Sequence, residues 1–144
     1  LSTDQKGAIA ESAIVHAAIK LGIGVLKPLT DGHRYDLVFE IGGHLARVQC
    51  KWAGLYGDVV VVRTYSNRRT ATGMRRRAYQ ATEIDAVVAY CPQLERCFFL
   101  PADRVAGRAQ VALRVAPSRN KQRARVNWAD DFAFELYNHN FPGP

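Results

Sequence analysis

The chain has 144 residues, 48% of them apolar, which fits one compact domain with a single core over residues 1–144. The net charge of +7 favours a polyanionic partner, and no run of about 18 apolar residues is present to cross a membrane. Charges recur through the first twenty positions, unlike a secretory signal peptide, and the three cysteines lack zinc-site spacing. We therefore expect an intracellular, cytoplasmic protein with free thiols.

The first predicted element is a helix that runs to about residue 21 and ends at Gly22. Its N-cap is expected to be Ser2, Thr3 or Asp4. Its apolar stripe consists of Ile14, Val15, Ala18 and Leu21. Glu11 lies on that stripe one turn earlier, so its carboxylate needs a partner: a cation, a metal or a hydrogen-bond donor.

A short strand is expected near residues 25–29, followed by a loop at 30–33. Two alternating runs, 35–41 and 44–52, flank Gly42-Gly43, which is typical of a tight β-hairpin. Beyond the hairpin we expect strands at 59–64, 84–90, 97–100 and 110–115, a loop or short helix at 65–79, a helical turn at 101–103, a loop at 117–125 and a helix at 128–137. This order predicts an α/β domain with a mixed sheet.

The hairpin indicates which side chains share a face. With the two glycines as its loop, the numbers of opposite residues add to 85, which places Asp36 opposite Gln49 with Cβ atoms about 5 Å apart. Lys51 is two residues beyond Gln49 and shares that face. The other face is nearly all apolar and is expected to be the core side. The three polar side chains thus converge near the open end of the hairpin, where Glu11 can reach them.

This set of residues suits phosphodiester hydrolysis. Mg²⁺, or Mn²⁺ in its place, prefers hard oxygen ligands, which Asp36, the Gln49 amide and the backbone carbonyl of Cys50 can supply. Glu11 can bind a second ion or a water on the metal, and Lys51 can orient the nucleophile or neutralise charge on the phosphate. The alternative for the hairpin alone is a polar outer sheet face with a surface ion pair.

The order Glu11, Asp36 and Gln49-Cys50-Lys51 resembles the PD-(D/E)XK nuclease superfamily, whose core is a helix and a bent hairpin bearing E, D and (D/E)-x-K. The chain is most similar to the Holliday-junction-resolvase-like branch and, within it, to homing endonucleases encoded in group I introns. The similarity extends to Tyr65-Ser66, the segment from Glu83-Ile84-Asp85 to Tyr90, Phe99-Leu100-Pro101, Leu113-Arg114 and Asn127-Trp128-Ala129.

This resemblance implies a restriction-endonuclease-like core, in which a mixed central sheet with flanking helices carries the active site on its hairpin. It also implies a metal-dependent, site-specific DNA endonuclease that uses Mg²⁺. Glu11, Asp36, Gln49 and Lys51 would then be catalytic, with the metal held by Asp36, Gln49, the Cys50 carbonyl and Glu11.

The motif departs from the family pattern twice. Tyr35 stands where the family pattern has proline, and Gln49 stands where it has the second acidic residue. The glutamine removes one negative charge from the metal site, which is expected to weaken ion binding. A Holliday-junction resolvase and a catalytically inactive DNA-binding module therefore remain as alternative functions.

Basic residues gather in two acid-free stretches. Residues 63–82 hold six arginines, and residues 104–125 hold six arginines and one lysine, so 13 of the 20 lysines and arginines lie there. They indicate contact with double-stranded DNA. The expected contacts are His33 and Arg34, which precede Asp36, together with Arg68, Arg69, Arg75, Arg76, Arg77, Arg119, Lys121, Arg123 and Arg125.

A double-strand cut by a chain with one active site predicts a symmetric homo-oligomer, either a dimer or a tetramer. Apolar residues near the C-terminus exceed what one helix face needs. The candidates for the subunit contact, which core packing can also claim, are Phe132, Phe134, Leu136, Tyr137 and Phe141.

Overall fold

The computed structural model describes residues 1–70, 73–78, 83–117 and 126–138, with the backbone alone at 66–70 and 73–78. Helix α1 (Thr3–Lys20) confirms the first predicted element. Ser2 is its N-cap: the Ser2 hydroxyl accepts a hydrogen bond from Gln5 N at 3.1 Å, and Gln5 Oε1 accepts one from Ser2 N at 2.8 Å. The helix ends where Gly22 adopts a φ of 77°, a conformation that glycine takes at low cost.

A mixed five-stranded sheet in the order β1-β2-β3-β8-β9 forms the centre of the molecule. Only the β3–β8 pair is parallel; the other neighbours are antiparallel. The strands are β1 (Gly24–Leu26), β2 (Leu37–Ile41), β3 (His44–Trp52), β8 (Ala86–Cys91) and β9 (Arg96–Pro101). The predicted hairpin is therefore confirmed as β2–β3, and β3 lies inside the sheet.

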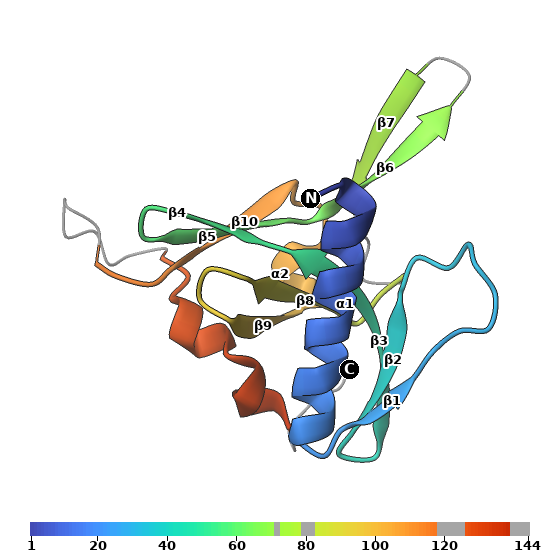
Figure 1. The fold of residues 1–144 in the computed structure, drawn as a ribbon, viewed down its shortest axis with the longest axis horizontal. Coiled ribbons are helices and arrows are strands. Elements are labelled where there is room, and N and C mark those ends of the chain that lie inside the picture. Colours follow the sequence, from blue (N-terminus) through green and yellow to red (C-terminus); the bar gives the residue numbers. More distant parts are fainter. Residues whose placement is uncertain (71–72, 79–82, 118–125, 139–144) are drawn as a thin grey trace.

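Helix α1 lies across one face of this sheet (Figure 1). Its buried residues Ala10, Ile14 and Ala18 point to the sheet because residues three and four apart share one side of a helix. Leu37 and Val48 are buried in the cluster that α1 covers. The face of the hairpin predicted to be apolar is thus the core side, which leaves the opposite face of β3 for polar residues.

A second sheet and a two-stranded ribbon lie beside the central sheet (Figure 1). The second sheet has the order β10-β5-β4 and is formed by β4 (Gly54–Tyr56), β5 (Val59–Arg63) and β10 (Gln110–Arg114). Val60, Val62 and Leu113 of this sheet pack in one core with Val87 and Leu100. Strand β8 is consequently buried on both faces, which explains its run of apolar residues.

The arginine-rich segment corrects one prediction. Instead of a loop or short helix, β6 (Tyr65–Thr70) and β7 (Gly73–Ala78) form an antiparallel ribbon. The two strands are close neighbours in the chain, paired from Tyr65↔Ala78 to Thr70↔Gly73, but the consecutive arginines obscure the alternation that would indicate strands. The predicted strand at 25–29 is also shorter, because β1 ends at Leu26 and Leu29 is fully exposed.

The predicted C-terminal helix is wrong as well. The segment forms two 3₁₀ turns, η1 (Ala129–Phe132) and η2 (Phe134–Tyr137), with Ala133 extended between them at φ −57° and ψ 131°. This break allows Phe132 to enter one core and Phe134 the other. Both phenylalanines are therefore core residues and not surface candidates for a subunit contact, whereas Leu136 is 57% exposed.

The predicted turn after Pro101 is confirmed as α2 (Ala102–Val105). All three cysteines are free thiols, two of them buried. Within the described part of the chain, no helix has the length and apolar character needed to cross a membrane.

Candidate active site

The register of the β2–β3 hairpin follows the prediction from Ile41↔His44 to Leu37↔Val48. The ladder stops just before Asp36. There the backbone nitrogen of Asp36 donates to the Val48 carbonyl at 2.8 Å. The predicted register instead places Asp36 opposite Gln49, one residue farther along β3. Asp36 therefore leaves the strand pairing at the open end of the hairpin.

The Asp36 carboxylate is partly buried and anchored to the neighbouring strand. Its Oδ2 accepts a hydrogen bond from the backbone nitrogen of Cys50 at 2.8 Å. Burial raises the pKa of Asp36 and the charge of Glu11 adds to the rise, while the Cys50 N–H, Lys51 and Lys27 oppose it. A raised pKa means that the ionised carboxylate lacks full compensation, so this position favours an added cation.

Lys51 lies near Asp36 and is held by the first residue of the ribbon. Its Nζ donates to the backbone carbonyl of Tyr65, the first residue of the basic ribbon, at 2.9 Å. Burial lowers the pKa of Lys51, Asp36 raises it, and Arg34 lowers it further. The hydrogen bond to Tyr65 fixes the lysine at the junction between the hairpin and the ribbon.

Glu11 lies on the buried stripe of α1 and therefore needs a partner for its carboxylate. That partner is Lys27. Lys27 Nζ lies 2.7 Å from Glu11 Oε1 and donates a hydrogen bond to it. This hydrogen bond and the charge of Glu11 raise the pKa of Lys27. Lys27 was not predicted as a site residue, since it lies outside the motif and only its position after β1 brings it to α1.

Glu11 and Asp36 line one small cavity together. It has a volume of about 180 Å³, and Lys27, Tyr35 and the loop residues 30–33 complete its wall. His33 contributes from that loop: its Nε2 lies 3.3 Å from Thr30 Oγ1, and its ring packs against Tyr35 at 5.1 Å between centroids. The cavity thus brings Glu11 and Asp36 together with His33, as the sequence suggested.

Gln49 lies on β3, where its backbone is paired with Val87 of β8. Because side chains alternate along a strand, Gln49 shares its face with Lys51 and not with Cys50. No cluster of three or more histidine, cysteine, aspartate or glutamate side chains suited to a metal occurs in residues 1–65, 83–117 and 126–138. The two carboxylates with the Gln49 amide oxygen and the Cys50 carbonyl are nevertheless hard oxygen donors, a set that fits Mg²⁺.

Two ion pairs join the hairpin region to the segment before β8. Arg34, expected to touch DNA, is held by Glu83: Nε and Oε2 are 2.8 Å apart, and the side chains are 22% and 17% exposed. Arg47 binds Asp85 through its backbone nitrogen at 2.7 Å and its Nε at 3.0 Å, which ties β3 to the start of β8. Glu83 was noted only within a segment similar to the family; its role as a partner of Arg34 is visible only in the structure.

Apart from His33 and Arg34, the predicted DNA-contacting residues divide into two groups. Arg68, Arg69 and Arg75–Arg77 lie in the ribbon, where Arg68 is paired with Arg75 and Asn67 with Arg76. The ribbon projects away from the two sheets (Figure 1). The other group, Arg119, Lys121, Arg123 and Arg125, lies outside the described residues.

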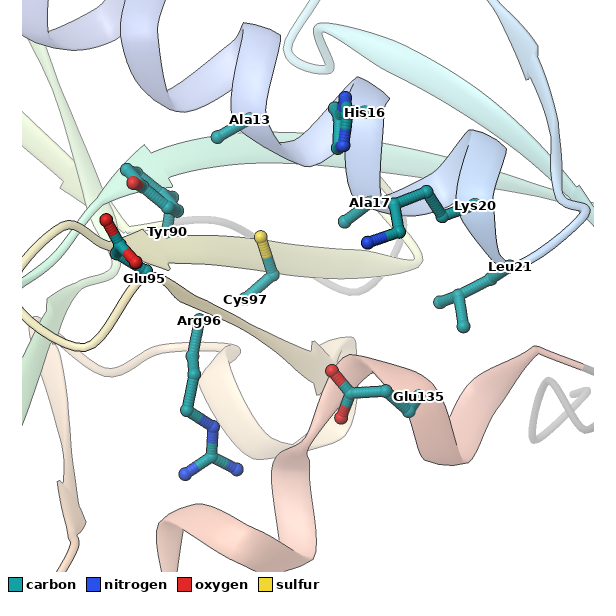
Figure 2. Close-up of a pocket in the computed structure, with 10 residues that line it drawn as sticks. All are labelled: Ala13, His16, Ala17, Lys20, Leu21, Tyr90, Glu95, Arg96, Cys97 and Glu135. Atoms are coloured by element: carbon teal, nitrogen blue, oxygen red, sulfur yellow. The ribbon is translucent and has the colours of Figure 1, made fainter.

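A separate cavity of about 370 Å³ lies between α1 and β9 (Figure 2). The Cys97 thiol points into it, with His16 and Lys20 of α1 on one side and Glu135 on the other. Burial raises the pKa of Cys97 to about 12, so this thiol is not activated as a nucleophile. The cavity holds none of the motif residues, so its larger size does not make it the candidate site.

Comparisons with known proteins agree with this geometry. The family model described as PD-(D/E)XK endonuclease matches residues 1–135. Among solved structures, the bacterial homing endonuclease I-Ssp6803I is similar, with a TM-score of 0.71 and 30% identity over 92% of this chain and 89% of that chain. No curated protein matches the chain. The resemblance predicted from the motif and the α/β fold class are confirmed, and the chain belongs to the PD-(D/E)XK endonuclease family.

Proposed function

We propose that this chain is a single-domain, Mg²⁺-dependent, site-specific endonuclease of double-stranded DNA that acts in intron homing inside the cell. The observation that carries the proposal is the arrangement of Asp36, Glu11 and Lys51 at the open end of the hairpin, beside the base of the basic ribbon. The similarity to I-Ssp6803I, a homing endonuclease, supports the biological role.

The side chains divide the work of phosphodiester hydrolysis. Asp36, Glu11, the Gln49 amide oxygen and the Cys50 carbonyl would hold the divalent cation, and the hydrogen bond from Cys50 N to Asp36 Oδ2 leaves the other carboxylate oxygen for it. When bound, the cation supplies positive charge to the scissile phosphate. Lys51, fixed by Tyr65, stabilises the negative charge that grows on the phosphate during attack by water.

The rest of the interface would position the DNA. Arg77 is paired with Ser66, next to the residue that fixes Lys51, and Arg68, Arg69, Arg75 and Arg76 lie farther along the ribbon. Phosphates bound along the ribbon would therefore continue toward the site. A two-stranded ribbon also has the width to enter the major groove. His33 at the cavity, together with Arg34 and the basic residues 119–125, is proposed to add phosphate contacts.

A cleavage assay on plasmid DNA carrying a library of inserted sequences tests this proposal. We expect specific cuts with Mg²⁺ or Mn²⁺ and none with excess EDTA. Full activity in EDTA would exclude metal dependence. Preferential cutting of a four-way junction over linear duplex would favour a resolvase. Salt-dependent DNA binding without cleavage in any divalent metal would favour the inactive module, for which Gln49 is the supporting departure.

We also propose that the working enzyme is a homo-oligomer, a dimer or tetramer, because two strands of opposite polarity must be cut by chains with one site each. Exposed Leu136 remains a candidate for the contact, and Phe141 lies outside the described residues. Light scattering combined with cleavage of supercoiled plasmid tests this. A stable monomer that produces only nicked circles at high enzyme concentration would instead indicate a nicking enzyme.

A further inference from the structure

Lys27 and Glu11 form their ion pair in the cavity that Asp36 also lines. Lys27 directly follows β1, and its Nζ lies 2.7 Å from Glu11 Oε1. The lysine side chain is 70% exposed, whereas the glutamate side chain is only 28% exposed. The ammonium therefore approaches from the solvent side and covers a carboxylate that is itself largely enclosed.

The cavity needs this positive charge when no metal is present. The carboxylates of Glu11 and Asp36 line the same small cavity, and the Lys27 ammonium lies 2.7 Å from the first of them. Lys51 is tied to the Tyr65 carbonyl and is largely buried, so it cannot move without losing that hydrogen bond. Lys27, held only at its tip and mostly in solvent, is the cation that can leave at low cost.

We propose that Lys27 is a placeholder cation: its ammonium holds the Glu11 carboxylate in the metal-free protein and leaves when a divalent ion binds there. This inference rests on the proposed function, since it needs the metal site. Mg²⁺ binds carboxylate oxygens at about 2.1 Å, so an ion held by either oxygen of Glu11 would lie only a few ångströms from the ammonium. Two cations so close repel, which makes their binding to Glu11 competitive.

Direct binding of Mn²⁺ without DNA tests this competition, measured by calorimetry at constant ionic strength. Lys27→Met is expected to bind Mn²⁺ more tightly, by roughly two- to five-fold, the range expected for loss of one exposed ion pair. Lys20→Met is the matched control, because it also removes one lysine charge, at a position on α1 roughly 13 Å along the helix from Glu11. Its Mn²⁺ affinity is expected to match that of the unaltered protein.

A double-mutant cycle separates competition at Glu11 from a general change in charge. In a Glu11→Gln background, Lys27→Met is expected to change Mn²⁺ affinity much less, because its ionic partner is gone. Lys27→Gln serves as a second variant, and circular dichroism verifies that each protein is folded.

The outcomes are distinct. Unchanged or weaker Mn²⁺ binding by both Lys27 variants would overturn the placeholder role while leaving the metal site intact. A gain of the same size in the Glu11→Gln background would also overturn it, because the effect would then not act through Glu11. Absence of Mn²⁺ binding by the unaltered protein would contradict the proposed metal site itself, and with it this inference.

Discussion

The open end of the β2–β3 hairpin and the β6–β7 ribbon meet where Lys51 binds the Tyr65 carbonyl, yet they carry charge in different ways. At the hairpin, the carboxylates of Glu11 and Asp36 line one small cavity with Lys27, and Lys51 lies near Asp36. In the ribbon, five arginines occur in a stretch of chain without acidic residues. Buried, opposed charges act as a unit, whereas exposed charges of one sign act additively on a polyanion.

The largest effect is expected from the hairpin. Asp36→Ala and Lys51→Ala should each lower the cleavage rate by at least about 10²-fold, since each removes a group from the reacting centre. DNA affinity, measured by gel shift in Ca²⁺, should change little. Lys6→Ala removes an exposed charge from α1 and should leave cleavage unchanged. Normal cutting by the Asp36 and Lys51 variants would place the chemistry elsewhere.

The ribbon should show the opposite behaviour. Replacing Arg75, Arg76 and Arg77 together by alanine should reduce the slope of log K against log salt by roughly 1 to 3 units, because fewer counterions are released. The cleavage rate of saturated complexes should change far less than affinity. A control that removes two charges from α1 instead is the double variant Lys6→Ala/Lys20→Ala, for which we expect an unchanged slope. A slope that stays constant in the triple variant would remove these arginines from the interface.

Substitutions of Gln49 test whether its side chain is a ligand of the metal. Gln49→Glu adds the missing negative charge and should tighten Mn²⁺ binding on the order of tenfold, whereas Gln49→Leu should weaken binding and cleavage by a similar factor. Equilibrium titration with Mn²⁺ measures both. Equal behaviour of the leucine variant and the unaltered protein would make Gln49 a structural residue only.

The smallest effect is a pH dependence of stability in the metal-free protein. Because burial raises the folded-state pKa of Asp36, the folded chain binds this proton more tightly than the unfolded chain does. The ionised carboxylate therefore destabilises the fold above that pKa, and this penalty disappears as the pH falls through it. Asp36→Asn should raise the melting temperature in EDTA near neutral pH, with a difference that shrinks toward acidic pH. A lower melting temperature of Asp36→Asn at neutral pH would show that the ionised carboxylate stabilises the fold instead.

The two regions also differ in how far sequence could predict them. The hairpin register follows from two glycines and a period-two pattern, both local, so the pairing from Ile41↔His44 to Leu37↔Val48 was predictable. The ribbon has no comparable pattern, because its alternation is obscured by consecutive arginines. The sequence therefore predicted the positive charge of the ribbon but not the pairing of its strands.

Within the site, the motif residues were visible because the chemistry demands particular side chains at a given spacing. Their partners were not: Lys27 reaches Glu11 across 16 positions, and Glu83 reaches Arg34 across a much longer stretch of chain. Such pairs depend on where β1 and the segment before β8 lie in space. Sequence spacing holds no information on that placement.

The sequence by itself determined the first helix, the hairpin, the family and the excess of positive charge, since each depends on local periodicity, motif or composition. Only the tertiary structure decided that Lys27 covers Glu11, that Arg34 is held by Glu83, and that the C-terminal segment breaks at Ala133. The physical reason is the same in each case. These features arise from packing and charge compensation between segments far apart in the chain, which local propensity does not specify.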